Sequence, residues 1–312
     1  MEKIVLWAIA VLVGAISFGE LGLRLFFGFG NPLLYIGDDR IGYLLAPNQD
    51  TRRFGNRIRI NRYSMRGAQI APTPEAGTLR VLLLGDSIAN GGWWTDDDET
   101  IAAIVARQLQ QKGRSPVEVP NASAHSWGPR NEFAYLQQFG HFQSDAVVLL
   151  INTDDLFATA PTALPVGRDR NYPERRPWCA WAEVFGRYLL PAPAIPELEA
   201  VRREGGDQVG KNLAAIAMMH EMLTAAGIPL VVAMTPLRRE LESGSRDYER
   251  VARQRLLELT QELNLLYLDF LPEFQALPPI DRFYRDTIHL SHQGNQLISE
   301  RIARAIETLL LH

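Results

Sequence analysis

Short apolar runs of strand length alternate with longer segments of helical periodicity from residue 80 onward, and this alternation most constrains the fold. The predicted strands are residues 80–85, 117–120, 146–152, 229–234 and 265–269. The predicted helices are residues 98–112, 129–140, 207–226, 246–263 and 292–311. Strands that alternate with helices favour a parallel sheet covered by helices on both faces. We therefore expect an α/β fold, a three-layer α/β/α sandwich with a parallel sheet of about five strands.

The N-terminal segment is hydrophobic enough for a membrane. Residues 4–18 carry no charge, and the run is a little shorter than the roughly 20 residues that a full span needs. Glu20 and Arg24 lie near its end, where their side chains can reach the interface. A cleaved signal peptide is the alternative, but Lys3 is a weak basic start and no clear A-x-A cleavage site follows. We expect residues 1–30 to be a single-pass signal anchor, with the rest of the chain on the periplasmic or extracellular side.

Three further segments divide the rest of the chain. Residues 31–79 are rich in Pro, Gly, Arg and Asn and are predicted to be a stalk that packs on the domain. Residues 80–312 are predicted to form the domain itself. Within it, the proline-rich stretch 157–206 is too long for a plain connection, so we expect an insertion near the functional site.

Charge and cysteine content exclude several functions. The net charge of -4, from 36 acidic and 32 basic side chains, offers no broad cationic face, so a nucleic-acid partner is not expected. Cys179 is the only cysteine, which rules out a disulfide framework and a Cys-rich zinc site. The histidines lack metal-ligand spacing, so neither a metal nor another cofactor is predicted.

Two short motifs stand where catalytic groups are expected. Gly85, Asp86 and Ser87 directly follow the first strand, and ligand sites of open parallel sheets form at the carboxyl ends of the strands. Asp286 and His289 precede the final helix. At a spacing of three residues, Asp286 can bond one imidazole nitrogen and leave the other to face the Ser87 hydroxyl. The sequence therefore predicts a nucleophile with its base and the group that orients the base.

The order of these motifs resembles that of a known family. GDS after the first strand, the loop NASAHS after the second and D-x-x-H before the last helix are similar to sequence blocks of the SGNH (GDSL-like) hydrolases, over about residues 80–311. The resemblance implies the flavodoxin-like SGNH hydrolase fold and metal-free transfer or hydrolysis of an acyl group through an acyl-serine intermediate. It also implies roles: Ser87 as nucleophile, His289 as general base and then acid, and Asp286 as the group that holds the imidazole tautomer.

The same resemblance suggests an oxyanion hole made of Ser87, Ser126, Gly128, Asn152 and Asp154. Ser126 stands where the family has a donating glycine, and Gly128 follows two residues later. In the third block, Asp154 stands where the family has an asparagine amide. Because an ionised carboxylate repels an oxyanion, either Asp154 is protonated by burial, or Asn152 donates instead, or activity is reduced.

Four more residues are candidates for substrate contacts. Trp93 and Trp94 follow the nucleophile turn and suit a stacking wall for a sugar or an acyl chain, although ordinary core packing is an equal alternative. Arg130 and Asn131 stand at a helix start, where they are placed to meet polar substrate groups.

Three functions are compatible with the sequence. The first is a serine esterase that removes an O-acyl group, such as acetyl, from an envelope or extracellular glycan or lipid. The second is an O-acyltransferase that uses the same triad in a site closed to water. The third is a non-catalytic, membrane-tethered glycan-binding protein on the same fold. The partners expected are thus an acyl-ester substrate, with carbohydrate as one class, and a membrane.

Overall fold

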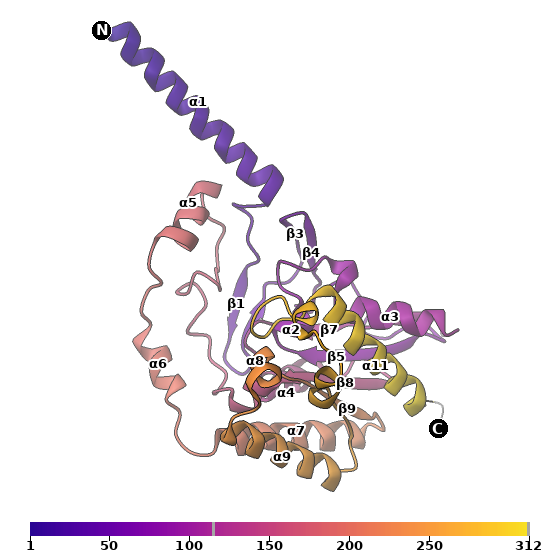
Figure 1. Ribbon diagram of the computed structural model, residues 1–312. Helices are drawn as coiled ribbons and strands as arrows, with labels where there is room; N and C mark the ends of the chain where they lie inside the picture. Colours follow the sequence, from indigo (N-terminus) through magenta and orange to yellow (C-terminus); the bar gives the residue numbers. More distant parts are fainter. Residues whose placement is uncertain (114–115, 311–312) are drawn as a thin grey trace.

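The computed structural model describes residues 1–113 and 116–310, and its centre is a parallel sheet between two layers of helices (Figure 1). The sheet contains β5 (Leu79–Gly85), β6 (Val117–Glu118), β7 (Asn121–Ser123), β8 (Ala146–Asn152), β9 (Leu230–Thr235) and β10 (Leu266–Asp269). The strand order is β10-β9-β8-β5, and β6 and β7 both pair with the outer side of β5. Every pairing among these strands is parallel. The predicted α/β class and parallel sheet are confirmed.

The predicted strand 117–120 is two short strands that share one position in the sheet. β6 pairs with Leu79 and Arg80, and β7 pairs with residues from Leu83 to Gly85. Between them lies Pro120, which has no N–H to donate to a ladder. Its carbonyl still accepts from the Leu83 N–H at 2.9 Å, so the proline interrupts the strand without separating it from β5.

Alternate residues of the strands supply two hydrophobic cores, one on each face of the sheet. Leu82 and Leu84 belong to one core and Val81 and Leu83 to the other. The first core is covered by α4 (Pro129–Phe139), α7 (Gln208–Ala225) and α9 (Asp247–Glu262). The second is covered by α3 (Ile101–Gln111) and α11 (His292–Leu310). These are the five predicted helices to within a few residues, although residue 311 of the last one lies outside the described residues.

Shorter helices fill the connections, chiefly around the site. They are α2 (Ser87–Asn90), η1 (Asp97–Glu99), η2 (Thr153–Phe157), α5 (Ala180–Val184), η3 (Phe185–Leu189), α6 (Pro196–Arg202), α8 (Arg238–Ser243), α10 (Leu271–Gln275) and η4 (Ile280–Phe283). The stretch expected as an insertion contains α5, η3 and α6, which lie along one side of the domain in Figure 1.

The segment expected as a stalk forms two antiparallel hairpins. They are β1 (Tyr35–Asp38) with β2 (Gly42–Leu45), and β3 (Gln49–Arg53) with β4 (Asn56–Ile60). The side chains of Ile41, Leu45 and Ile58 are at most 1% exposed and belong to the core on the α4 and α7 side. Because a stalk would not contribute to the main core, we propose that the segment is an integral part of the domain.

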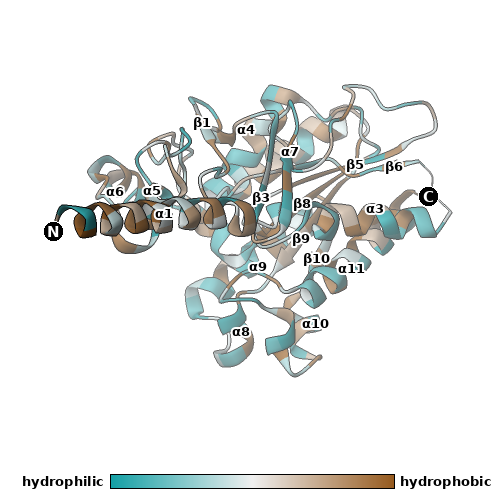
Figure 2. Ribbon diagram, turned by 90° about the horizontal axis from the view of Figure 1, so that it is seen from above, coloured by the Kyte–Doolittle hydropathy of each residue, from teal (hydrophilic) through white to brown (hydrophobic). Residues whose placement is uncertain are grey.

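The N-terminal helix α1 (Glu2–Phe27) projects from the domain (Figure 1) and is apolar along most of its length (Figure 2). None of its residues is buried. Among the described helices, α1 alone is long and apolar enough to cross a membrane, a test that a signal sequence also meets. The helix continues through Glu20 and Arg24, which form an ion pair at 2.7 Å.

Candidate active site

Ser87 begins the one-turn helix α2 directly after β5. Asp86 caps this helix, because its Oδ1 accepts the Ile88 N–H at 2.8 Å. The residue before it must be glycine, since a Cβ on Gly85 would lie 2.6 Å from the Leu150 carbonyl oxygen. The strand can therefore run directly into the turn, with Ser87 at the carboxyl edge of the sheet and 8% exposed.

The structure brings Ser87, His289 and Asp286 together in a chain of hydrogen bonds. Ser87 Oγ lies 3.0 Å from His289 Nε2, and His289 Nδ1 lies 2.8 Å from Asp286 Oδ2. Asp286 Oδ1 also accepts the backbone N–H groups of Ile288 and His289, at 3.0 and 2.8 Å. Burial alone would raise the pKa of Asp286, but these donors and the imidazole outweigh it and hold the pKa below its usual 3.8. Asp286 is thus held as an acceptor that orients the imidazole.

A cluster of buried carboxyl groups lies behind the nucleophile. The side-chain amide of Asn152 donates to Asp86 Oδ2 at 3.0 Å and to Asp155 Oδ2 at 2.8 Å. Burial raises the pKa of Asp86 and of Asp155. Ser87 Oγ lies 3.2 Å from Asp86 Oδ2, so this carboxyl group competes with His289 for the single hydroxyl hydrogen. Asp86 Oδ2 also accepts from the Asn152 amide, while His289 Nε2 lies 3.0 Å from the Ser87 hydroxyl oxygen.

Ser126 has a left-handed backbone, with φ 59°, at the position aligned with the family's glycine. A glycine reaches this conformation without strain, whereas a serine does so at a cost. Its hydroxyl is 3.1 Å from the Tyr172 hydroxyl, which donates to it. Ser126 lines the cleft that holds Ser87, so the structure retains a residue of the predicted oxyanion hole there.

Two other predicted oxyanion donors are already engaged. The Gly128 N–H donates to Asn131 Oδ1 at 3.1 Å, and a Cβ at Gly128 would lie 2.3 Å from the Ala158 Cβ. Both amide hydrogens of Asn152 are used by Asp86 and Asp155. In this structure the hydrogens of both residues stabilise the loops behind the nucleophile, and their role as oxyanion donors stays a prediction.

Asp154 is exposed and lines the same cleft as Ser87. Its surface is open to solvent, but the protein packed around it removes part of its hydration. This loss of hydration is the chief cause that raises its pKa from the usual 3.8, and the charge of Glu249 adds to it. A raised pKa is the shift that the expectation requires, namely that a protonated Asp154 tolerates a developing negative charge.

Arg130 and Asn131 both make internal hydrogen bonds, and Asn131 also lines the cleft that contains Ser87, so their role in substrate binding stays a prediction. The Arg130 guanidinium donates to the Ala158 carbonyl at 2.7 Å and to Glu204 at 2.9 Å. The Asn131 amide donates to the Ile41 carbonyl at 2.8 Å. A residue at a helix start serves loop capping as readily as ligand binding, and the sequence alone does not distinguish the two.

The cleft that contains Ser87 has a volume of about 380 Å³. One wall comes from the insertion, which contributes a run from Phe157 to Thr162 together with Tyr172, Leu198 and Arg202. Tyr43, from the second strand of the first hairpin, lies on another wall. Residues from the segment 157–206 therefore line the cleft, and a residue of the hairpin segment lines it as well.

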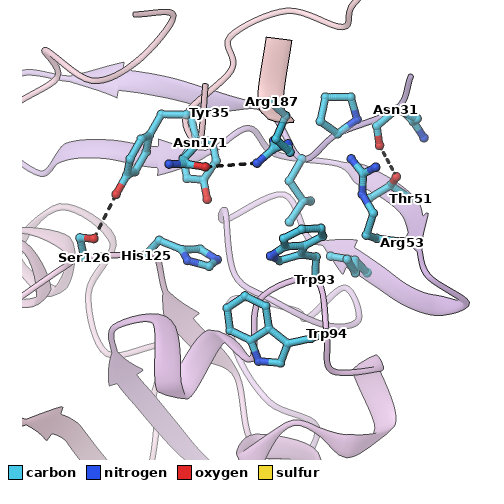
Figure 3. Close-up of a pocket in the computed structure, with 14 residues that line it drawn as sticks. Asn31, Tyr35, Thr51, Arg53, Trp93, Trp94, His125, Ser126, Asn171 and Arg187 are labelled. Carbon is cyan, nitrogen blue, oxygen red and sulfur yellow. Dashed lines mark hydrogen bonds between the residues drawn. The ribbon is translucent and has the colours of Figure 1, made fainter. Parts of the chain in front are cut away.

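A second pocket of about 280 Å³ adjoins this cleft (Figure 3). Trp93 and Trp94 line it, and the Trp94 ring lies 4.6 Å from the His289 ring, centroid to centroid. Trp94 therefore lies beside the triad, whereas Trp93 also packs against the hydrophobic core on the α4 and α7 side. Sequence reasoning missed the residues that face them, namely Arg53, His125, Asn171, Tyr172 and Arg187.

A parallel α/β sheet with serine, histidine and aspartate converging at its carboxyl edge has the architecture of a serine hydrolase. The model of the GDSL-like lipase/acylhydrolase family matches residues 83–297. The chain belongs to that family, and it is an SGNH-type serine ester hydrolase.

Solved structures agree on the fold. An acetyl xylan esterase, AlAXEase, superposes with a TM-score of 0.51 at 14% identity, over 73% of this chain and 100% of that one. A lipase/acylhydrolase from Enterococcus faecalis gives a TM-score of 0.46 at 16% identity, over 74% and 96% of the two chains. At 14% identity the likeness to the acetyl xylan esterase shows the fold alone. A search of curated proteins gave no significant match.

Proposed function

We propose that this chain hydrolyses an O-acyl ester through an acyl-serine intermediate on Ser87. The observation that carries the proposal is the 3.0 Å contact between Ser87 Oγ and His289 Nε2, with Asp286 on the other imidazole nitrogen at 2.8 Å. This geometry lets the imidazole take the hydroxyl proton as the oxygen attacks an acyl carbonyl.

The steps of the reaction balance with these three side chains and water. Ser87 Oγ forms a bond to the acyl carbon while its proton moves to His289. The alcohol leaves with that proton, and the acyl group stays on Ser87. Water then attacks the acyl-serine, gives a proton to His289, and releases the carboxylic acid as Ser87 regains its hydrogen.

Backbone donors support the oxyanion. Ser87 is the first residue of α2, so its N–H has no partner inside the helix. The Ser126 N–H lies on the loop that lines the same cleft, in the left-handed backbone expected of a glycine. We assign these two N–H groups as the donors, and Asp154 as a neighbour whose raised pKa lowers its repulsion of the oxyanion.

We also propose that α1 anchors the enzyme in a membrane. Its 26 residues span about 39 Å at 1.5 Å per residue, more than the roughly 30 Å of a bilayer's hydrocarbon core. The segment 157–206 contacts the C-terminal part of this helix. Trp181 Nε1 donates to the Ile16 carbonyl at 3.1 Å, and the Ala180 N–H donates to the Glu20 carboxylate at 2.8 Å. Exposed apolar side chains lie on this contacting segment, which suits the membrane interface: Trp178 (87% exposed), Leu189 (66%) and Leu190 (61%).

The esterase proposal is tested by turnover of p-nitrophenyl acetate. The full chain in detergent micelles is compared with Ser87→Ala and His289→Ala between pH 5 and 9. We expect kcat to fall by roughly 10⁴-fold in either variant, because each removes a member of one functional unit. Ser243→Ala and His220→Ala, at positions outside the site, serve as matched controls with unchanged rates. Equal rates in all five proteins would contradict the proposal.

A further inference from the structure

The residues that line the pocket beside the catalytic cleft indicate the charge of its ligand. Figure 3 shows Ser126 and His125 at one side, Arg53 at the other, and Trp93 between them. Arg187 also lines the pocket, and no carboxylate is among the residues that line it in the described part of the chain. Burial, above all, lowers the pKa of His125 to about 4, so His125 is neutral near pH 7 and the arginines set the charge.

The two arginines share a single carboxylate. The Arg53 guanidinium pairs with Glu183, and Arg187 Nε lies 3.7 Å from Glu183 Oε1. Glu183 also accepts the Gly30 N–H at 2.6 Å. Within the described chain, Arg53 Nη1 and Arg187 Nε are buried without a hydrogen-bond partner. Since two positive groups meet one negative group, one positive charge at this wall lacks a counter-charge, and an anion would supply it.

The other walls are aromatic and amide-bearing. Trp93, Trp94, Tyr35 and Tyr172 contribute rings, and Asn171 contributes a side-chain amide. The Arg187 Nη1 and Nη2 atoms donate to Asn171 Oδ1 and to the Arg170 carbonyl, at 3.1 and 3.2 Å. An acyl chain would still leave Arg53 Nη1 and Arg187 Nε without a partner, at a cost. A bare inorganic anion would leave the aromatic walls without a partner. A pyranose ring presents apolar C–H faces and polar hydroxyl edges, so a sugar that carries a carboxylate matches both kinds of wall.

The pocket is connected to the nucleophile. Ser126 and Tyr172 line both this pocket and the cleft that contains Ser87. Trp94 lines the pocket and packs against His289, with 4.6 Å between the two ring centroids. A sugar ring in this pocket therefore lies next to the position of the acyl group that Ser87 would attack.

We propose that this pocket binds a carboxylate-bearing sugar unit of the substrate, with Arg187 and Arg53 facing its carboxylate and Trp93 and Trp94 contacting its ring. The inference rests on the proposed esterase function, and it names the sugar part of the ester. Arg187 is the specificity-determining residue, because its side chain is 18% exposed whereas that of Arg53 is 5% exposed.

Binding to the Ser87→Ala protein tests this inference without any turnover. The full chain in detergent is titrated calorimetrically at low salt with four-unit oligomers of galacturonate and of glucuronate, and with cellotetraose as the neutral probe. We expect at least one uronate oligomer to bind about ten-fold more tightly than cellotetraose, which is the scale of one charge-assisted hydrogen bond. Arg187→Gln should remove that preference, Arg187→Lys should restore part of it, and Trp93→Ala should weaken binding of the preferred oligomer.

Arg175→Gln is the control, since Arg175 is 86% exposed and does not line the pocket, and its affinities should not change. Three results would overturn the inference. They are equal affinity for charged and neutral oligomers, no binding of any oligomer, and a preference for the charged oligomer that survives Arg187→Gln. Because p-nitrophenyl acetate needs no sugar site, its turnover by the parent protein reports on the esterase proposal separately.

Discussion

Asn152 donates both hydrogens of its amide to Asp86 and Asp155, and so ties the nucleophile turn to the end of β8. Replacement by alanine leaves two buried carboxyl groups without this donor. We expect Asn152→Ala to lower the free energy of unfolding by about 1–3 kcal/mol, the usual cost of an unsatisfied buried group. Urea unfolding at pH 7 measures the change. A stability equal to that of the parent would show that the amide is not part of this support.

Glu132 on α4 is a buried carboxyl group, and it predicts how the stability of the fold depends on pH. Its side chain is 0% exposed, neither carboxylate oxygen has a hydrogen-bond partner in the described chain, and burial holds its pKa well above the usual 4.5. Above pH 4.5 the unfolded chain releases this proton while the folded chain keeps it, so rising pH destabilises the fold.

The variant Glu132→Gln keeps the shape and removes this titration. Relative to the variant, the parent should lose about 1.4 kcal/mol of stability per pH unit above pH 4.5, until the pH reaches the folded-state pKa of Glu132. Urea unfolding of both proteins at pH 5, 6 and 7 gives the difference. A difference that stays constant with pH would show that Glu132 is ionised in the folded state.

Asp154 provides a pH-dependent test of the oxyanion hole. Because its pKa is raised, the side chain becomes ionised, and repels the oxyanion, only as the pH rises through that pKa. Asp154→Asn should match the parent at low pH and exceed its kcat/KM by about ten-fold at high pH. Profiles of both proteins with p-nitrophenyl acetate give the ratio. A ratio that does not change with pH would place the carboxylate outside the field of the oxyanion.

The membrane proposal predicts where single fluorophores meet lipid. In a Cys179→Ser background, an environment-sensitive dye is attached after Leu12→Cys on α1, Leu189→Cys on the insertion, or Val251→Cys on α9. In lipid nanodiscs that contain nitroxide-labelled lipid, we expect quenching at the first two positions and none at the third. Val251 is 59% exposed, and its helix α9 lies on the far side of the domain from α1 (Figure 1). Quenching at Leu12 alone would limit the contact to α1, and no quenching at Leu12 would refute the anchor.

The sequence predicted the elements that local patterns encode. The five predicted strands, one of which is divided into β6 and β7, and the five long helices follow from apolar runs and helical spacing. The GDS and D-x-x-H motifs located the three residues that converge. What it missed depends on tertiary contacts. Arg53 and Glu183 are far apart in the chain, and nothing local indicates that they pair. The hairpins of residues 31–79 bury isolated side chains such as Ile41 and Ile58 rather than a periodic face. The sequence pattern therefore gave no sign that these side chains belong to the core. The engagement of Gly128 by Asn131 likewise exists only in the folded loop.

The most direct test of the central claim is covalent capture of the nucleophile. The full chain in detergent is treated with a fluorophosphonate, which reacts with activated serines, and the modified residue is identified by peptide mass spectrometry. We predict one adduct on Ser87, abolished in Ser87→Ala and formed at least 10³-fold more slowly in His289→Ala, because the imidazole at 3.0 Å activates the hydroxyl. An adduct on another serine, or an unchanged labelling rate without His289, would contradict the account.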